Sequence, residues 1–89
     1  MIRYYIIVEG RVQGVGFRYF CQMNAINLNL TGWVRNMDNG MVEMEVQGYE
    51  KILLKFISII SKGNYFIKID SVSKKEINLV QSETKFKIK

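Results

Sequence analysis

Histidine and proline are both absent from this chain of 89 residues, and it has one cysteine, Cys21. A lone cysteine excludes an internal disulfide. Without histidine, the usual structural zinc sites cannot be assembled. The apolar run near the N-terminus is too short for a secretory signal or a membrane span. We therefore expect a cytoplasmic protein that holds no metal and no cofactor and does not contact a membrane.

The length leaves room for a single core. A hydrophobic fraction of 48% is ordinary for a globular protein. A domain of this size buries only about 60–65% of the surface that its unfolded chain exposes, so we expect modest stability. The expectation is one folded domain over residues 1–89, present as a monomer.

The formal charge of +5 comes with a concentration of lysine in the last third of the chain. A basic protein suits an anionic ligand, which could be a small phosphate compound or a nucleic acid. The alternative is a surface that only keeps the protein soluble. Composition does not decide between them. The lysines concerned are Lys62, Lys68, Lys74, Lys75, Lys85, Lys87 and Lys89.

A strand, a glycine-rich loop and a helix are predicted over the first third. Residues 3–9 are β-branched and aromatic, which favours a strand, and residues 10–16 contain three glycines, which favours a loop. From Phe17 the apolar side chains recur at helical spacing as far as Leu28. Asn29 then suits the left-handed residue that ends many helices.

A hairpin follows. Residues 32–36 and 41–47 are predicted strands, joined by a turn, Met37-Asp38-Asn39-Gly40, whose Asn-Gly pair adopts positive φ cheaply. The second of these strands alternates in polarity, which predicts one buried and one wet face. On the buried face we expect Val42, Met44 and Val46, and on the wet face Glu43, Glu45 and Gln47.

The second half is expected to add a helix and two strands. Residues 50–62 have a wide apolar face, and Gly63 follows as the cap. Residues 65–72 are predicted to form a strand. A short tail strand should point Phe86 and Ile88 inward and its lysines outward, where they protect a sheet edge from aggregation.

This order, βαββαβ plus a short C-terminal strand, predicts the topology. A right-handed crossover makes the first two strands parallel, and the tight hairpin makes the third antiparallel, so that it can lie between them. The result is an α+β, ferredoxin-like sandwich with an open, mostly antiparallel sheet and two helices on one face. The loop 10–16 and the end of the second strand near Asn36 should then meet in space.

The segment from Gly10 to Arg18 has the features of an anion site. It joins a strand to a helix N-terminus, where unpaired N–H groups and a partial positive charge attract anions. Gly14 and Gly16 let the backbone turn its N–H groups inward, and Arg18 in the first turn could grip phosphate oxygens. The alternative is an ordinary glycine-rich turn beside a solvent-facing arginine. Neither the dinucleotide fingerprint nor a P-loop fits this spacing.

These residues resemble the acylphosphatase family. Gly10-x-Val12-Gln13-Gly14-Val15-x-Phe17-Arg18 matches the family signature G-x-V-Q-G-V-x-F-R at every fixed position. Thr31-Gly32-Trp33-Val34-Arg35-Asn36-x-x-x-Gly40-x-Val42 is similar to a second family segment, G-W-V-x-N-x-x-x-G-x-V. The chain departs from the family pattern at Asn29, after the second helix and at its C-terminus.

The resemblance implies metal-independent hydrolysis of an acyl phosphate, with inorganic phosphate as product and competitive inhibitor. It implies that Arg18 binds the phosphate and that Asn36 orients the attacking water. The phosphate-binding backbone would be Gln13, Gly14, Val15, Gly16, Phe17 and Arg18.

Other hypotheses have less support in the sequence. Cys21 could be a nucleophile, but it lies on the apolar face of the predicted helix, which indicates a core residue. Glu43 and Glu45 share one strand face and are expected to be solvated rather than an acid pair. A nucleic-acid-binding domain would need exposed aromatics on its central strands, where only Tyr4 and Tyr5 are candidates. A degenerate domain that binds a partner conflicts with the presence of both Arg18 and Asn36.

Overall fold

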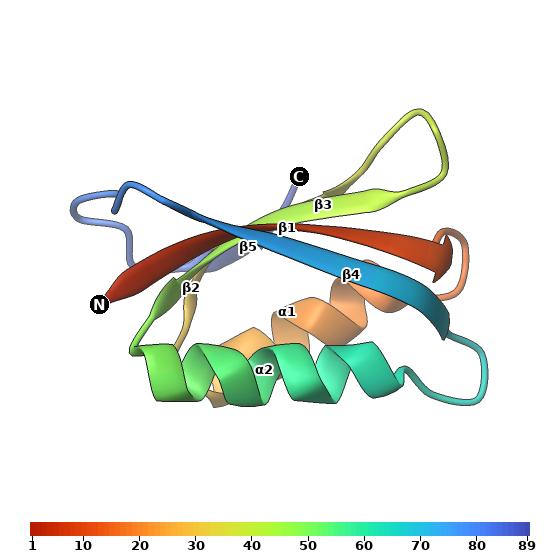
Figure 1. Ribbon diagram of the computed structural model, residues 1–89, viewed down its shortest axis with the longest axis horizontal. Helices are drawn as coiled ribbons and strands as arrows, with labels where there is room; N and C mark the ends of the chain where they lie inside the picture. Colours follow the sequence, from red (N-terminus) through yellow and green to blue (C-terminus); the bar gives the residue numbers. More distant parts are fainter.

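The computed structural model describes all of residues 1–89 and contains five strands and two helices (Figure 1). In chain order these are β1 (Ile2–Arg11), α1 (Phe17–Asn27), β2 (Thr31–Asn36), β3 (Val42–Gly48), α2 (Glu50–Lys62), β4 (Lys68–Ile77) and β5 (Phe86–Ile88). The predicted order of elements is confirmed. Neither helix has the length and apolar character needed to cross a membrane.

The five strands form one sheet in the order β4-β1-β3-β2-β5. Strand β3 is antiparallel to both β1 and β2, so those two run in the same direction, and β5 is parallel to β2. Both helices lie against one face of the sheet (Figure 1). This confirms the ferredoxin-like sandwich, and it brings the C-terminal ends of β1 and β2 to one edge.

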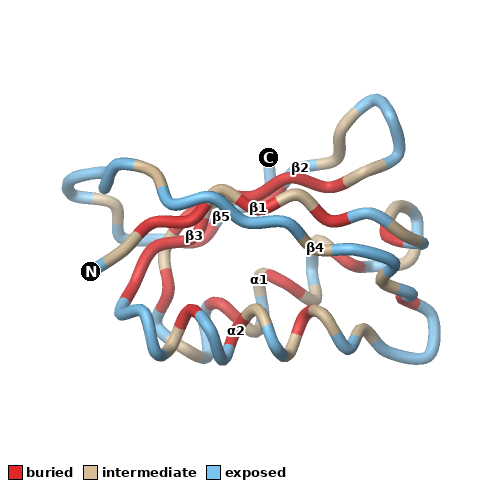
Figure 2. Tube along the Cα trace, viewed as in Figure 1, coloured by how far each residue is buried: buried red, intermediate tan, exposed pale blue.

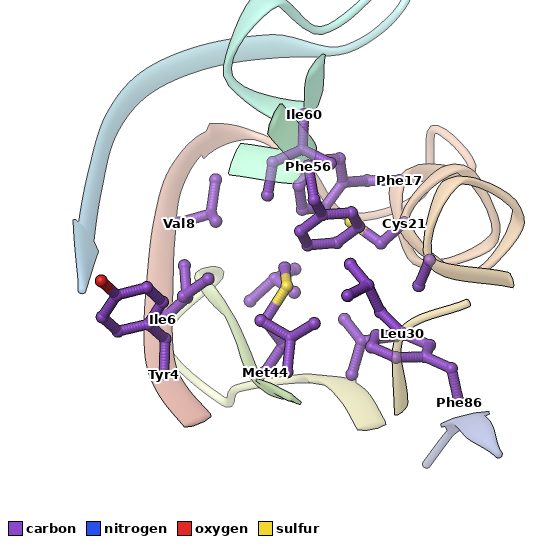
Figure 3. Packing of buried hydrophobic residues seen from close by; sticks show 14 of the residues in the cluster. Tyr4, Ile6, Val8, Phe17, Cys21, Leu30, Met44, Phe56, Ile60 and Phe86 are labelled. Carbon is purple, nitrogen blue, oxygen red and sulfur yellow. The ribbon is translucent and has the colours of Figure 1, made fainter. Parts of the chain in front are cut away.

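The core fills the space between the sheet and the helices (Figure 3). Alternate residues of β1 and β3 point toward the helices: Tyr4, Ile6 and Val8 from β1, and Val42, Met44 and Val46 from β3. For β3 this is the buried face that its alternating polarity predicts. The apolar faces of the helices pack against these residues. They contribute Phe17, Cys21 and Ala25 from α1, and Leu53, Phe56 and Ile60 from α2. Figure 2 shows the buried positions on the central strands and on the inner sides of the helices.

Several local predictions are confirmed and one is refined. Asn29 has a φ of 58°, the left-handed conformation expected after α1. In the β2–β3 turn only Gly40 has a positive φ, of 90°. Asn39 instead accepts a hydrogen bond from the Met41 N–H at 3.0 Å, which stabilises the turn through its side chain.

The predicted fourth strand, residues 65–72, is wrong in its boundaries. The strand runs from Lys68 to Ile77, and Tyr65 and Phe66 lie outside it, 94% and 64% exposed. Its second half is polar and exposed because β4 is an edge strand that is held by pairing with β1 rather than by burial of its own side chains.

The wet face predicted for β3 is also wrong. Glu43 and Gln47 are each only 8% exposed, and Glu45 is half-buried. The chain between β4 and β5, residues 78–85, covers part of this face, and arginines from β1 and β2 contact the rest.

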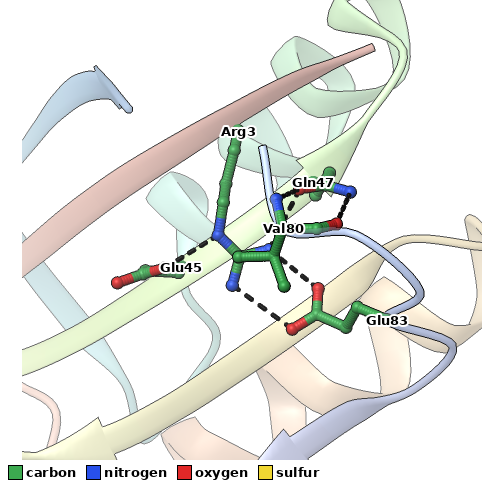
Figure 4. Close-up of polar contacts among 5 residues, drawn as sticks. All are labelled: Arg3, Glu45, Gln47, Val80 and Glu83. Atoms are coloured by element: carbon green, nitrogen blue, oxygen red, sulfur yellow. Dashed lines mark hydrogen bonds and ion pairs between the residues drawn. The ribbon is translucent and has the colours of Figure 1, made fainter. Parts of the chain in front are cut away.

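A buried arginine organises this covered face (Figure 4). Arg3 is 1% exposed, and its guanidinium donates to Glu45 at 2.7 Å, to Gln47 at 3.2 Å and to Glu83 at 2.8 Å. Gln47 in turn bonds both the N–H and the carbonyl of Val80, at 2.9 and 3.0 Å. Together these contacts clamp the 78–83 segment onto the sheet.

The same contacts shift the ionisation of the clamp. Burial alone would lower the pKa of Arg3, but its bonds to Glu83 and Glu45 outweigh burial and raise it. Burial would raise the pKa of Glu83, but its hydrogen bonds to Arg3 and Thr31, together with the positive charges of Arg3 and Lys89, outweigh burial and lower it. Both groups therefore stay charged.

Candidate functional site

The glycine-rich loop turns its backbone into the N-terminus of α1 through two left-handed glycines. Gly14 has a φ of 74° and Gly16 a φ of 81°. A Cβ at either position would meet no other atom within 4 Å, so the backbone conformation, not crowding, requires glycine there. The space beside this turn of the chain is open.

Backbone N–H groups at the start of α1 have no hydrogen-bond acceptor. No side chain caps the helix, and its first turn contains no acidic residue. The first N–H of the helix to find an acceptor is that of Phe20, which donates to the Gly16 carbonyl at 3.0 Å. The N–H groups of residues 13–19 therefore have no acceptor within the chain. Unpaired donors at the positive end of a helix form an anion-binding arrangement.

Arg18 stands beside these donors. It is the second residue of α1, is half-buried, and forms no ion pair. Together with Gly14 and Gly16 it lines a cavity of about 180 Å³, whose apolar lining includes Val12 and Phe17. A free guanidinium next to open N–H groups is a ready partner for phosphate oxygens.

Asn36 is the last residue of β2 and carries an unusual polar atom. Its Oδ1 is buried and is the single buried side-chain oxygen or nitrogen of the chain that lacks a hydrogen-bond partner. Leaving such an acceptor unpaired costs about 1–3 kcal/mol. A bound water or ligand that donates a hydrogen bond to this oxygen would account for it.

The predicted meeting of the loop with the end of β2 is confirmed. Val42 of β3 pairs with Val8 of β1 on one side and with Asn36 on the other. Gln13 adds a direct connection, because its Nε2 donates to the carbonyls of Met37 and Met41 at 2.8 and 2.9 Å. The loop is thus tied to the hairpin immediately after Asn36.

Arg18 and Asn36 nevertheless open onto different hollows. The cavity at Arg18 does not include Asn36, which lines a polar cavity of about 500 Å³ with Arg35 and the turn residues. Around this second cavity, Tyr5 and Arg35 both donate hydrogen bonds to Glu43, and these bonds lower the pKa of that carboxyl. Glu43 is therefore an ionised, paired group, neither solvated as predicted nor half of an acid pair.

Sequence reasoning missed part of the cavity wall. Tyr19 and Ile88 both line the cavity at Arg18. Ile88 arrives because β5 runs parallel to β2, where it pairs with Val34. The prediction that Ile88 points into the core does not hold, since it is 39% exposed; Phe86 is buried as predicted. The sequence offered one signal for this part of the wall, because Ile88 is an apolar residue near the end of a lysine-rich edge strand.

The remaining candidates lack the surroundings that their hypotheses need. Cys21 is fully buried, and burial raises the pKa of its thiol, which keeps it protonated and unreactive. Tyr4 is buried on the core side of the sheet, so its ring cannot stack on a base, and Tyr5 is half-buried with its hydroxyl bonded to Glu43. No three Cys, Asp or Glu side chains are grouped as a metal site would require.

Comparison with known proteins identifies the family of this chain. The family model described as Acylphosphatase matches residues 4–88. An acylphosphatase of Clostridium beijerinckii is 54% identical over 89 residues, covering 100% of this chain and 99% of its own. One from Bacillus licheniformis is 50% identical over 88 residues, covering 99% and 98%. The crystal structure of acylphosphatase from Bacillus subtilis has a TM-score of 0.93 at 44% identity, covering 99% and 98%. The chain therefore belongs to the acylphosphatase family of enzymes.

Proposed function

We propose that this chain, as one domain over residues 1–89, hydrolyses the carboxyl–phosphate bond of acyl phosphates to a carboxylate and inorganic phosphate, without a metal. The observation that carries the proposal is the unpartnered, buried Oδ1 of Asn36 beside a loop whose N–H groups have no acceptor. A bound phosphoryl group and one water molecule would supply the partners that both sets of groups lack.

The phosphoryl group would be held by the loop. The backbone N–H groups from Gln13 to Arg18 would donate to its oxygens, and the Arg18 guanidinium would add a charge-assisted grip. Since negative charge is redistributed over these oxygens in the transition state, donors fixed beforehand by the fold would stabilise it. The positive charge comes from the chain itself, which supports chemistry without a metal ion.

The water would be positioned by Asn36. Its Oδ1 would accept a hydrogen bond from the water and so direct the oxygen lone pair at phosphorus. As the new P–O bond forms, the bond between phosphorus and the carboxyl oxygen breaks, and the acyl group leaves as a carboxylate with the bonding electrons. A carboxylate is a good leaving group and needs no strong general acid. The water proton would pass to a phosphate oxygen.

The same site defines the partners that we expect. Inorganic phosphate, which is the product, would occupy the loop and compete with substrate. We predict further that the enzyme is a monomer, that it is cytoplasmic, and that it binds neither nucleic acid nor membranes.

The test is steady-state hydrolysis of benzoyl phosphate, with and without EDTA and added inorganic phosphate. We expect turnover that EDTA leaves unchanged and that phosphate inhibits competitively. Absence of turnover would contradict the proposed reaction. Loss on chelation that is restored by adding a metal ion would contradict the metal-free mechanism, and non-competitive inhibition would place phosphate elsewhere.

A further inference from the structure

The turn between β2 and β3 contains the one asparagine of the chain that is followed by glycine, in the pair Asn39-Gly40. Both residues are exposed, and the turn projects from the sheet into solvent (Figure 2). An asparagine side chain can react with the backbone nitrogen of the next residue, and a glycine leaves that nitrogen unshielded because it has no Cβ. A Cβ at Gly40 would meet no other atom within 4 Å, so the space beside this residue is open.

A hydrogen bond prepares the Asn39 side chain for this reaction. The Met41 N–H donates to Asn39 Oδ1 at 3.0 Å, which closes the side chain over the intervening Gly40. If the Gly40 nitrogen attacks Cγ of Asn39, negative charge develops on Oδ1, and this donor is already in place to stabilise it. The Gly40 N–H is itself held only by a bond of 3.3 Å to the Met37 carbonyl, which is longer than the usual range.

We propose that Asn39 is a deamidation site, and that its conversion to isoaspartate slows the enzyme by displacing the hairpin from the glycine-rich loop. The loss of activity rests on the proposed function, whereas the chemical conversion of Asn39 does not.

The conversion needs only water and hydroxide. The Gly40 nitrogen loses its proton to hydroxide and attacks Cγ of Asn39, so that a new C–N bond closes a cyclic imide. The bond from Cγ to Nδ2 breaks, and the amide nitrogen leaves with the bonding electrons, takes a proton from water and departs as ammonia. Water then opens the imide. Cleavage at Cγ gives aspartate, and cleavage at the main-chain carbonyl carbon gives isoaspartate, with no oxidation or reduction in either case.

An isoaspartate would lengthen the turn where the site depends on it. The main chain would run through Cβ and Cγ of residue 39, which adds one carbon and about 1.5 Å of chain. Residue 39 lies between Met37 and Met41, whose carbonyls both accept hydrogen bonds from Gln13, at 2.8 and 2.9 Å. A longer chain between these two carbonyls moves one relative to the other, so Gln13 would no longer hold both. The tie between the loop and the residue after Asn36 is then weakened.

Both products also add a carboxylate beside Asn36. Asn39 and Asp38 line the same polar cavity as Asn36. A second carboxylate next to Asp38 disfavours an anionic substrate, but the effect is small because these exposed charges are screened by salt. Aspartate adds this charge alone, whereas isoaspartate adds the charge and the extra carbon, so the two products separate the effects.

The test is peptide mapping by mass spectrometry of the folded protein during incubation in alkaline buffer. We expect the peptide that contains Asn39 to gain the mass of replacing an amide nitrogen by oxygen, and to resolve into an aspartate and an isoaspartate form. Asn64 is the internal control, because it is also exposed and its Oδ1 accepts N–H bonds from Phe66 and Ile67 at 2.9 Å each, but Tyr65 follows it. Asn39 should convert at least about tenfold faster than Asn64, which corresponds to a barrier about 1.4 kcal/mol lower.

The activity of the same samples tests the coupling to the site. As isoaspartate accumulates, kcat for benzoyl phosphate should fall toward a value about tenfold or more below its start, because a displacement of about 1 Å in a positioned group has effects of this size. Asn39→Asp should lose no more than about threefold, since it carries the charge without the extra carbon. Asn39→Ser keeps an oxygen acceptor for the Met41 N–H and has no amide to lose, so its kcat should stay constant through the incubation.

An Asn39 that stays intact, or one that converts no faster than Asn64, would overturn the assignment of the site. Conversion of Asn39 with an unchanged kcat, or an equal decline in Asn39→Ser, would overturn its coupling to catalysis. Absence of turnover before the incubation would instead contradict the proposed function, and the mass spectra would still decide whether Asn39 deamidates.

Discussion

The Nε2 of Gln13 donates a hydrogen bond of 2.8 Å to the carbonyl oxygen of Met37. Gln13 belongs to the glycine-rich loop, and Met37 directly follows Asn36 at the end of β2. This side chain, which also bonds the Met41 carbonyl at 2.9 Å, spans the two parts of the candidate site. The spacing between the phosphate loop and Asn36 therefore depends on an amide that need not touch substrate with its own side chain.

Gln13→Ala should lower kcat by about tenfold or more, because a displacement of about 1 Å in a positioned group can cost up to about a hundredfold. The phosphate Ki should change much less, since the backbone N–H groups and Arg18 remain. Gln81→Ala, at an exposed glutamine far along the chain, serves as the control. A normal kcat in Gln13→Ala would show that the hairpin finds its place without this bond.

Arg18→Gln should reduce kcat/KM at least about a hundredfold, the scale of losing one strong donor to a transition-state oxyanion. Both the substrate KM and the phosphate Ki should rise, because the charge meets phosphate in the ground state as well. Arg11→Gln removes a positive charge from an exposed position at the end of β1 and should have little effect. Matching activities in the two variants would reduce Arg18 to a surface residue.

Arg3→Met should destabilise the fold by about 1–3 kcal/mol, because it leaves Glu45, Gln47 and Glu83 without their shared donor. In a domain of this size, that lowers Tm by about 4–8 °C for each kcal/mol. Thermal unfolding followed by circular dichroism measures the change. Arg35→Met, at an exposed arginine, should cost less, and an equal loss in both variants would deny Arg3 a special role.

The carboxylates of the covered sheet face should make the fold sensitive to acid. The pKa of Glu43 is lowered by its bonds to Tyr5 and Arg35, and that of Glu83 is lowered by Arg3 in spite of burial. A group with a lowered pKa in the folded state adds stability above its unfolded pKa and loses it as pH falls. Tm should therefore decrease as the pH is lowered below about 4.5, the ordinary pKa of glutamate.

Arg3→Met should reduce this acid dependence, because the pKa of Glu83 then moves back toward its ordinary value. A Tm that stays constant from pH 7 to pH 3, or a wild-type slope in the variant, would contradict the assignment.

Local pattern was sufficient wherever an element buries its own side chains. The apolar period of α2 and its flanking Gly63 placed that helix at residues 50–62, as the structure has it. The alternation of Val42, Met44 and Val46 assigned the inner face of β3 correctly. The adjacency of the loop and Asn36 followed from the right-handed crossover that makes β1 and β2 parallel and from the tight hairpin that places β3 between them.

What the sequence could not indicate depends on contacts between distant segments. Lys74 and Lys75 belong to β4 only through pairing with β1, and nothing in their own pattern signals a strand. Glu43 looks like a wet residue until Tyr5 and Arg35 are placed over it. Ile88 enters the site because an edge strand more than fifty positions away in sequence pairs beside Val34.

In the proposed mechanism Asn36 directs the water, while the loop and Arg18 hold the phosphate. If its Oδ1 orients the nucleophile, Asn36→Ala should lower kcat by about a hundredfold or more, the scale of a positioning effect, and leave the phosphate Ki and Tm close to wild type. The alternative is that Asn36 supports the hairpin, which predicts a lower Tm with losses in both kcat and phosphate affinity. Asn39→Ala provides that comparison, because it removes the turn bond to the Met41 N–H and leaves Asn36 in place.

The most direct measurement is kcat for benzoyl phosphate, phosphate Ki and Tm on one preparation of Asn36→Ala. A large fall in kcat with unchanged Ki and Tm is the predicted result. A normal kcat in a folded Asn36→Ala protein would contradict the account, because the water would then be held by another group.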